Sequence, residues 1–248
     1  MVTAQHAERG IVYIASGAAY VRDAERSARS ARKQHPDLPI ALFSDVPSSD
    51  PVFDLWFEVT DAHRRSKLDC LPRTPFRDTL YLDADTRVVG SITEPFDLLD
   101  RCDLAGCHVE NRHPKSSATA RLTGAHVAAA FTGLNGGVLY YRLNDRMRRF
   151  LEKWSAGYKA ENAKFDQPIL RRLMWEMPDI TVIALPPEYN LRTMRSILFR
   201  SANESQARLL HLPWYKSADS APYRLWRTIR TLRCYPGNLV LMIRAFFM

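Results

Sequence analysis

The sequence predicts a single α/β domain with a mainly parallel central sheet, and two observations carry this prediction. Short runs rich in β-branched, aliphatic and aromatic residues alternate with helical patterns along most of the chain. Residues 11–15, 21–34 and 40–44 form a strand, a helix and a second strand in quick succession. A unit of this kind requires parallel strands joined by a right-handed crossover. The 248 residues, 46% of them hydrophobic, suffice for a substantial core, which excludes a disordered tail and a fibrous repeat.

The predicted elements follow one another without an internal repeat. The first strand, residues 11–15, ends in a turn at Ser16 and Gly17, and small residues lie at helical spacing in residues 21–34 until Pro36 ends the helix. Further strands are expected at residues 55–59, 79–82, 103–107, 137–141 and 181–185, and helices at residues 145–160 and 166–176. Residues 111–124 have no strong period and are expected to form a mobile loop.

A pair of carboxylates follows the predicted strand 79–82 directly. In open sheets of this class, ligands bind beyond the carboxyl ends of the strands. Asp83 and Asp85 are two residues apart, so in an extended segment both side chains point to the same side. Their mutual repulsion is relieved by a cation, and a divalent ion held by oxygens also binds phosphate. The pair therefore favours a nucleotide diphosphate site, with a solvated turn as the alternative.

The phrase Leu82-Asp83-Ala84-Asp85-Thr86 has a second interpretation, the aspartyl-phosphate loop of haloacid-dehalogenase-like phosphatases. In those proteins the nucleophilic Asp follows the first strand of the core, and a Thr or Val stands four residues later. Here Arg87 occupies that place and the pair follows the fourth predicted strand. Both differences disfavour a phosphatase.

Several further motifs occur in a fixed order along the chain. They are Ala15-Ser16-Gly17 with Tyr20, then Lys67, then residues 75–85 (PFRDTLYLDAD), 134–142 (LNGGVLYYR), 166–168 (DQP), 187–190 (PEYN) and 211–216 (HLPWYK). The ordered set resembles the GT-A glycosyltransferases, and among them the retaining family-8 type of glycogenin and the bacterial lipopolysaccharide galactosyltransferases. The resemblance spans residues 10–217. It implies a GT-A fold, the Rossmann-like fold of nucleotide-diphospho-sugar transferases, over residues 1–216.

The resemblance also implies a metal site. Asp83 and Asp85 would hold Mn²⁺ or Mg²⁺, with His211 as the third protein ligand. An imidazole among oxygen ligands favours Mn²⁺. From the residues alone, His211 between Leu210 and Leu212 is equally compatible with a core histidine that bonds to the backbone.

Further roles follow from the same resemblance. Tyr20 would stack on a uracil, Lys67 and Lys216 would neutralise a diphosphate, and Asp166 and Gln167 would lie at the reacting face near the anomeric carbon. The implied contacts to the nucleotide sugar are Ala15, Ser16, Gly17, Tyr20, Lys67, Asp83, Ala84, Asp85, Gly136, Gly137 and Lys216, and the implied catalytic residues are Asn135, Asp166 and Gln167. Structural alternatives exist for these residues: a turn at the two glycines, a helix cap at Asp166 and a surface position for Lys67.

The predicted function is metal-dependent transfer of a hexose from a UDP-sugar to a hydroxyl of a glycan or glycolipid, with retention of configuration. An inverting GT-A transferase, a nucleotidyltransferase on the same fold and a non-catalytic scaffold are the alternatives. The sequence pI of about 9.5 also suggests a nucleic-acid-binding protein. However, no nucleic-acid-binding motif accompanies the charge, and the first 190 residues have no net charge, so no nucleic-acid partner is expected.

The excess positive charge lies near the end of the chain. From residue 191 onward, ten basic residues face two acidic ones, Glu204 and Asp219, which accounts for the net charge of +8. Arginines at every third position from Arg224 to Arg233, with Trp226 and Ile229 beside them, predict a basic amphipathic helix within a C-terminal extension, residues 217–248. Residues 223–248 would attach to an anionic membrane surface, or the helix would simply pack on the domain.

The bulk features suggest where the protein resides. Four cysteines without a zinc-binding spacing are typical of a reduced, intracellular protein. We expect no signal peptide and no membrane-spanning segment, since no apolar run approaches the ~20 residues needed to cross a bilayer. The expected location is the cytoplasm, with peripheral attachment at the inner face of the membrane.

Overall fold

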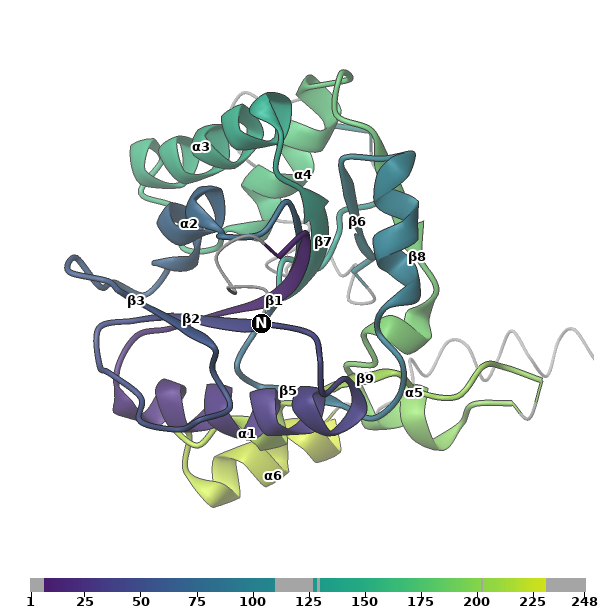
Figure 1. The fold of residues 1–248 in the computed structure, drawn as a ribbon. Helices are drawn as coiled ribbons and strands as arrows, with labels where there is room; N and C mark the ends of the chain where they lie inside the picture. The colour runs from purple at the N-terminus through teal and green to yellow at the C-terminus, as the bar shows by residue number, and fades with distance from the viewer. Residues whose placement is uncertain (1–6, 110–126, 129, 202, 231–248) are drawn as a thin grey trace, which may run out of the picture.

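The computed structural model describes residues 7–109, 127–128, 130–201 and 203–230. A seven-stranded sheet forms the centre, and helices cover both of its faces (Figure 1). The strands are β1 (Arg9–Ala15), β2 (Ile40–Ser44), β3 (Leu55–Glu58), β4 (Asp78–Leu82), β5 (Thr86–Val88), β6 (Leu104–Cys107), β7 (Val138–Arg142), β8 (Val182–Leu185) and β9 (Leu209–His211). The predicted α/β class is confirmed.

Six α-helices and four short 3-10 helices complete the described part of the chain. The α-helices are α1 (Ala18–Gln34), α2 (Lys67–Cys70), α3 (Asp145–Ala160), α4 (Gln167–Glu176), α5 (Met194–Leu198) and α6 (Ala221–Arg230). The 3-10 helices are Leu71–Arg73, Glu94–Asp100, Pro187–Tyr189 and Pro213–Tyr215. The first helix begins three residues before its predicted start, because Gly17, at φ 91°, lets the chain turn directly from β1 into it.

The central sheet has the order β3-β2-β1-β4-β7-β6-β8. Four of its six pairings are parallel, and β7 runs antiparallel between β4 and β6. The sheet is therefore mainly parallel, as predicted. The carboxyl ends of β1, β2 and β4 meet at one edge, because Ile11 of β1 pairs with Ile40 on one side and Leu80 on the other.

Two hydrophobic layers hold the sheet. On one face, Ala24, Ala28 and Ala31 of α1 allow the helix to approach the strands closely, and all three are fully buried. On the opposite face, α2, α3 and α4 pack over the sheet, with Phe150 and Trp154 of α3 among the largest buried side chains. Alternate residues of β1 contribute to the two layers, so both faces of the strand are apolar.

A small second sheet was not predicted from the sequence. Strand β5 follows the carboxylate pair and joins β9 in an antiparallel pair, in which Thr86 lies opposite His211. The pairing brings the chain near residue 211 to the carboxyl end of β4. It therefore positions a histidine beside two aspartates that precede it by more than a hundred residues.

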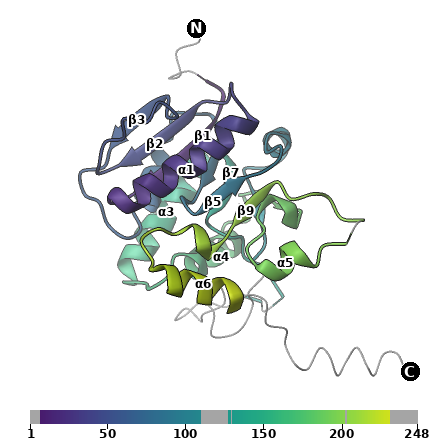
Figure 2. The ribbon, with the colours of Figure 1, turned by 90° about the horizontal axis from the view of Figure 1, so that it is seen from below.

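Helix α6 begins the predicted C-terminal extension. It lies against the 3-10 helix Pro213–Tyr215. In Figure 1 it lies beneath α1, and in Figure 2 it lies at the lower edge of the view. Ser217, just before it, donates hydrogen bonds to Asp23 of α1 through both its backbone nitrogen and its hydroxyl. Among the residues that the structure describes, no helix is long and apolar enough to cross a membrane. The predicted loop 111–124 and the chain from residue 231 onward, with Arg233, lie outside the described residues.

Candidate active site

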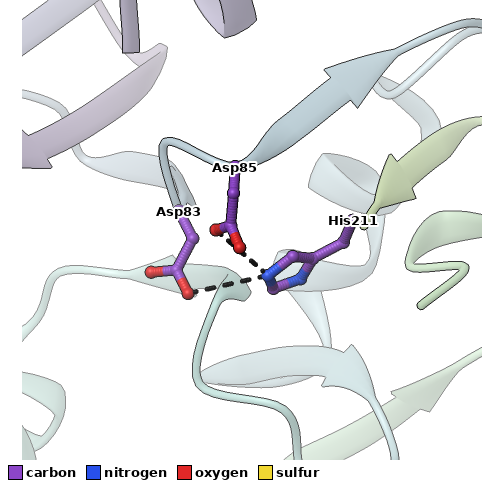
Figure 3. A group of neighbouring side chains, drawn as sticks. All are labelled: Asp83, Asp85 and His211. Atoms are coloured by element: carbon purple, nitrogen blue, oxygen red, sulfur yellow. Dashed lines mark ion pairs between the residues drawn. The ribbon is translucent and has the colours of Figure 1, made fainter. Parts of the chain in front are cut away.

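Three side chains of types that can bind a metal converge where β4 ends. Asp83 and Asp85 project from the turn between β4 and β5, and His211 reaches them from the end of β9 (Figure 3). The His211 Nε2 atom lies 3.3 Å from Asp85 Oδ1 and 3.8 Å from Asp83 Oδ2. One ligand atom of each residue lies within 4.8 Å of the others. The three residues that the resemblance assigned to a metal are therefore brought together.

The carboxylate of Asp85 is held in its ionised form. Its side chain is only 9% exposed, and Lys216 Nζ lies 3.2 Å from its Oδ2. Burial acts to raise the pKa of Asp85, but His211 and Lys216 outweigh it and hold that pKa well below its ordinary value. In the same way, the charge of Asp85 raises the pKa of Lys216. Both groups are charged at neutral pH.

The carboxylate of Asp83 is oriented by a tyrosine hydroxyl, which binds the oxygen that does not face His211. Tyr81, two residues earlier on β4, donates a 2.6 Å hydrogen bond from its hydroxyl to Asp83 Oδ1. Burial and the neighbouring Asp83 raise the pKa of Tyr81 well above its ordinary value, so the phenol keeps its proton. The backbone nitrogen of Asp83 donates to Gly137 O at 2.7 Å, which ties the turn to the start of β7. The Asp83 Oδ2 atom thus remains directed toward His211.

A second cluster lies next to the first, around Asp166. This residue precedes α4 and is 4% exposed, and its carboxylate pairs with Lys67 Nζ at 3.0 Å and Arg65 Nε at 3.2 Å. Burial acts to raise the pKa of Asp166, yet the two cations lower it below its ordinary value. Trp154 of α3 donates from Nε1 to the Asp166 carbonyl oxygen at 2.9 Å. Asp166 is therefore a fixed, ionised carboxylate.

Lys67 connects the two clusters. Besides Asp166, its Nζ atom lies 3.8 Å from Asp83 Oδ1 and donates to Gly136 O at 2.7 Å. The same ammonium group lies near the rings of Tyr81 and Trp154, 5.5 Å and 5.9 Å from their centroids. An isolated surface lysine, the structural alternative, does not fit these contacts. Lys67 is 12% exposed. It links Asp166 to the cluster of Asp83, Asp85 and His211, which is called the metal-type cluster below.

Both clusters lie in a cleft of about 770 Å³. Of the residues that the sequence singled out, those lining it are Ala15, Ser16, Gly17, Tyr20, Lys67, Asp83, Ala84, Asp85, Asn135, Gly137, Asp166, Gln167, His211 and Lys216. Gly136 does not line the cleft, although its carbonyl oxygen holds Lys67. The volume is suited to a ligand of the size of a nucleotide sugar.

The far end of the cleft is formed where β1 and β2 end. Gly17 donates its backbone N–H to Asp45 Oδ1 at 2.7 Å, and Ser16 Oγ donates to Ser66 Oγ at 3.2 Å. Tyr20, on the first turn of α1, is a 43% exposed residue. The end of the cleft therefore combines backbone groups with an accessible aromatic face.

Sequence reasoning missed several residues of the cleft. Arg65 pairs with Asp166, and Arg64 and Arg192 line the cleft without an ion pair to a carboxylate among the described residues. Asn190, behind the metal-type cluster, bonds to His211. Residues 187–190 were noticed as a motif, but the pattern gave Asn190 no role. Only the position of Arg65 two residues before Lys67 could have drawn attention to it.

Gly137 has little space for a side chain, and this leads to a prediction. A Cβ atom at Gly137 would lie 2.4 Å from Asp83 Oδ2 and 2.6 Å from His211 Cε1. Gly137→Ala is therefore expected to displace both ligands and to weaken Mn²⁺ binding about 10–100-fold, as when the supporting contacts of metal ligands are lost. Titration of Mn²⁺ followed by electron paramagnetic resonance measures the change.

The neighbouring glycine provides the matched control. A Cβ atom at Gly136 would come no nearer than 3.3 Å to Trp154 and 3.6 Å to Lys67 Nζ, and would touch no ligand of the cluster. Gly136→Ala should retain nearly the parent affinity. Equal Mn²⁺ affinities for the parent and Gly137→Ala would contradict the geometry described here for the three ligands.

Comparisons with known proteins identify the fold. No protein-family model matches the sequence, and no curated protein matches it. The galactosyltransferase LgtC, solved in complex with donor and acceptor sugar analogs, is similar with a TM-score of 0.61 and 16% identity, over 92% of this chain and 98% of that chain. The glycosyltransferase GlyE of Streptococcus pneumoniae has a TM-score of 0.57 and 21% identity, over 91% of this chain and 61% of that chain.

A third similar structure is mouse xyloside xylosyltransferase 1, with a TM-score of 0.52 and 12% identity, over 83% of this chain and 97% of that chain. Likeness at these identities shows the fold. The prediction of a GT-A fold is confirmed, and the three metal-type ligands lie at the sheet edge where this class of fold binds its ligands.

Proposed function

We propose that the protein is a metal-dependent glycosyltransferase that moves a hexose from a UDP-sugar to a hydroxyl of a glycan or glycolipid, with retention of configuration. The observation that carries this proposal is the cluster of Asp83, Asp85 and His211 in the cleft of a fold shared with sugar transferases. LgtC, of which this chain covers 98%, was solved with donor and acceptor sugar analogs.

The three ligands fit a divalent cation. Two carboxylates and one imidazole, each with an atom within 4.8 Å of the others, form a donor set suited to Mn²⁺ and, less well, to Mg²⁺. Such an ion, when bound, would supply positive charge to the donor diphosphate and to the nucleotide that leaves. Asp83, Asp85 and His211 would hold it.

Two lysines would assist at the diphosphate. Lys216 and Lys67 line the cleft on either side of the carboxylate pair. Lys216 forms an ion pair with Asp85, and Lys67 forms one with Asp166. The departing UDP gains negative charge as the glycosidic bond breaks, and fixed cations stabilise that charge without reorganisation. Each ammonium group would therefore act at the phosphates rather than at the sugar.

The nucleoside and sugar would occupy opposite ends of the cleft. Ala15, Ser16 and Gly17 would contact the ribose and base, with Tyr20 stacking on the uracil. Asp166, Gln167 and Asn135 would face the sugar. In support, Lys67 Nζ lies 3.0 Å from Asp166 Oδ2 and 3.8 Å from Asp83 Oδ1, so both carboxylates lie near one ammonium group. Retention requires either attack on the same face as departure or a transient adduct with Asp166 or Gln167.

The experiment that tests the proposal is to determine the product's anomeric configuration by NMR, using UDP-hexoses, Mn²⁺ and a panel of sugar acceptors. We expect the product to have the configuration of the donor linkage. An inverted product would assign the inverting alternative on the same fold. In a parallel reaction with UTP and a hexose 1-phosphate in place of the UDP-hexose, release of pyrophosphate would assign nucleotidyl transfer. UDP and Mn²⁺ binding without turnover of any donor would favour a scaffold.

Helix α6 would attach the protein to an anionic membrane surface. Its side chains at Tyr223, Leu225, Trp226 and Ile229 are about half exposed, although they are large and apolar. Arg230 lies 5.3 Å from the centroid of the Trp226 ring, so cationic and aromatic groups share this face. An exposed apolar face bordered by arginines is typical of helices that lie in a membrane interface. This placement would bring the cleft close to a lipid-linked acceptor.

Binding to vesicles tests the role of α6. A protein with Trp226→Ser and Ile229→Ser is expected to bind phosphatidylglycerol vesicles at least about tenfold more weakly, because burial of one such side chain contributes about 1.5–3 kcal/mol. Co-sedimentation of the full chain measures this. Trp56→Ser, at an exposed tryptophan of edge strand β3, is the control. Unchanged binding by the α6 variant would contradict the attachment.

A further inference from the structure

Asn190 lies directly behind the imidazole of His211. It follows the 3-10 helix Pro187–Tyr189 and is 2% exposed. Its side chain contacts His211 Nδ1 at 3.1 Å on one side and Asn135 Oδ1 at 3.0 Å on the other. Asn190 is not among the residues that line the cleft. It therefore contacts the site only through two other side chains.

The hydrogen bonds determine which way each amide points. The backbone N–H of Gly137 can only donate, and it donates to Asn135 at 3.2 Å, so the accepting atom is Oδ1. The Asn190 group that meets this oxygen must also be a donor, which is Nδ2. The opposite atom, Asn190 Oδ1, then faces His211 and accepts a hydrogen bond from Nδ1. Reversing Asn135 would set its Nδ2 against the Gly137 N–H, and reversing Asn190 alone would set two amide oxygens against each other.

This chain of bonds leaves the other imidazole nitrogen available as a ligand. When Nδ1 carries the proton, Nε2 of the neutral ring has a lone pair, and this atom is the one directed at Asp83 and Asp85. A hydrogen bond to the far nitrogen also fixes the ring's rotation. Asn190 therefore determines both the tautomer and the orientation that a metal ligand needs.

We propose that Asn190 is a positioning residue that acts on the metal site through His211. The proposal rests on the proposed metal site but adds a residue that touches neither metal nor substrate. Removing a hydrogen-bond partner of a metal-ligating histidine typically costs about 10–100-fold in metal affinity. A second hydrogen bond, from Asn190 to Asn135, couples the imidazole to the segment before β7 that lines the cleft.

Titration of the full chain with Mn²⁺ alone, followed by the electron paramagnetic resonance signal of the free ion, tests this role. Asn190→Leu keeps the branched shape of the side chain but removes both hydrogen bonds, and we expect Mn²⁺ binding about 10–100-fold weaker than in the parent. The same change made in a His211→Ala background should add little, because Asn190 acts only through His211. A full additional loss in the double variant would overturn the proposal.

A matched asparagine separates positioning from loss of stability. Asn144, which caps α3 by accepting from the Met147 N–H, is also part of the packed structure but lies away from the cleft. Asn144→Leu should lower the thermal midpoint while leaving Mn²⁺ affinity unchanged. If Asn144→Leu and Asn190→Leu weaken Mn²⁺ binding equally, the effect of Asn190 is a general loss of stability and the proposal is wrong.

A spectroscopic signature gives a second readout. In ¹⁵N-labelled parent protein at alkaline pH, the His211 ring should show the tautomer protonated at Nδ1, assigned by its loss in His211→Ala. In Asn190→Leu, we expect the signal to shift toward the tautomer protonated at Nε2. An unchanged tautomer would overturn the proposal, whereas a parent protein without a saturable Mn²⁺ site would overturn the proposed metal site together with it.

Discussion

Replacing Asp85 by Asn is expected to lower the rate of sugar transfer about 10³-fold. Asp85 contributes a ligand atom, and its charge also holds Lys216 at 3.2 Å and faces His211 at 3.3 Å. The substitution keeps the shape of the side chain but removes its negative charge. Loss of one fixed group that stabilises developing charge already costs about 10²–10³ in rate, and here the cation itself would be lost. The release of UDP from a UDP-hexose with Mn²⁺ measures the change.

A carboxylate outside the cleft is the control for this experiment. Asp97 pairs with Arg9 on the surface, and its side chain is 71% exposed, so Asp97→Asn should transfer sugar at the parent rate. Asp83→Asn should behave like Asp85→Asn, because both belong to the same cluster. Parent-like activity of both cluster variants would show that the metal assignment is wrong.

Replacing Asp166 by Asn is expected to have the second large effect, on stability as well as on activity. The change leaves Lys67 and Arg65 beside a neutral amide in a buried environment. Removing one partner of a buried ion pair typically destabilises a protein by about 3–5 kcal/mol, and the value here should lie at the lower end because Arg65 is partly exposed. Unfolding in urea measures the loss of free energy.

A double variant tests whether the charge itself causes this loss. Asp166→Asn with Lys67→Met removes one of the two cations that have lost Asp166 as a partner, and it should recover part of the stability, with a coupling of about 0.5–3 kcal/mol. Additive losses would mean that the ion pair contributes little. Activity of the single variant should fall independently of stability when it is measured well below the thermal midpoint.

The parallel half of the fold could be predicted because its signals are local. Strands β1 and β2 are continuous apolar runs, and the alanines of α1 lie at helical spacing, so each element is recognisable within its own window. The direction of β7 could not be predicted. A strand buried on both faces has the same composition whether it runs parallel or antiparallel, and its neighbours β4 and β6 are set by the whole topology.

Short elements escaped prediction for a physical reason. Strand β9 has three residues, too few to show an alternation, and it exists because β5 supplies its hydrogen-bonding partners. Helix α2 has four residues and is held by packing on α3. In both cases tertiary contacts, rather than intrinsic propensity, stabilise the element.

In the candidate site, too, features with a signal in the sequence could be predicted, and contacts that arise from the tertiary structure could not. Asp83, Asp85 and His211 were selected because they belong to motifs that occur in order along the chain, and the structure brings them together. The contacts that hold them were not predictable. Arg65 and Asn190 acquire their roles from side chains far away in the sequence, Asp166 in one case and His211 with Asn135 in the other.

The most direct test of the account is a screen of UDP-sugars for the release of UDP, because slow hydrolysis of the donor needs no knowledge of the acceptor. The parent protein with Mn²⁺ should release UDP from at least one UDP-hexose. The release should stop when a chelator removes the metal, and it should return when Mn²⁺ is restored. Release that persists unchanged in the chelator, or no release from any UDP-sugar with Mn²⁺ present, would contradict a metal-dependent sugar transferase.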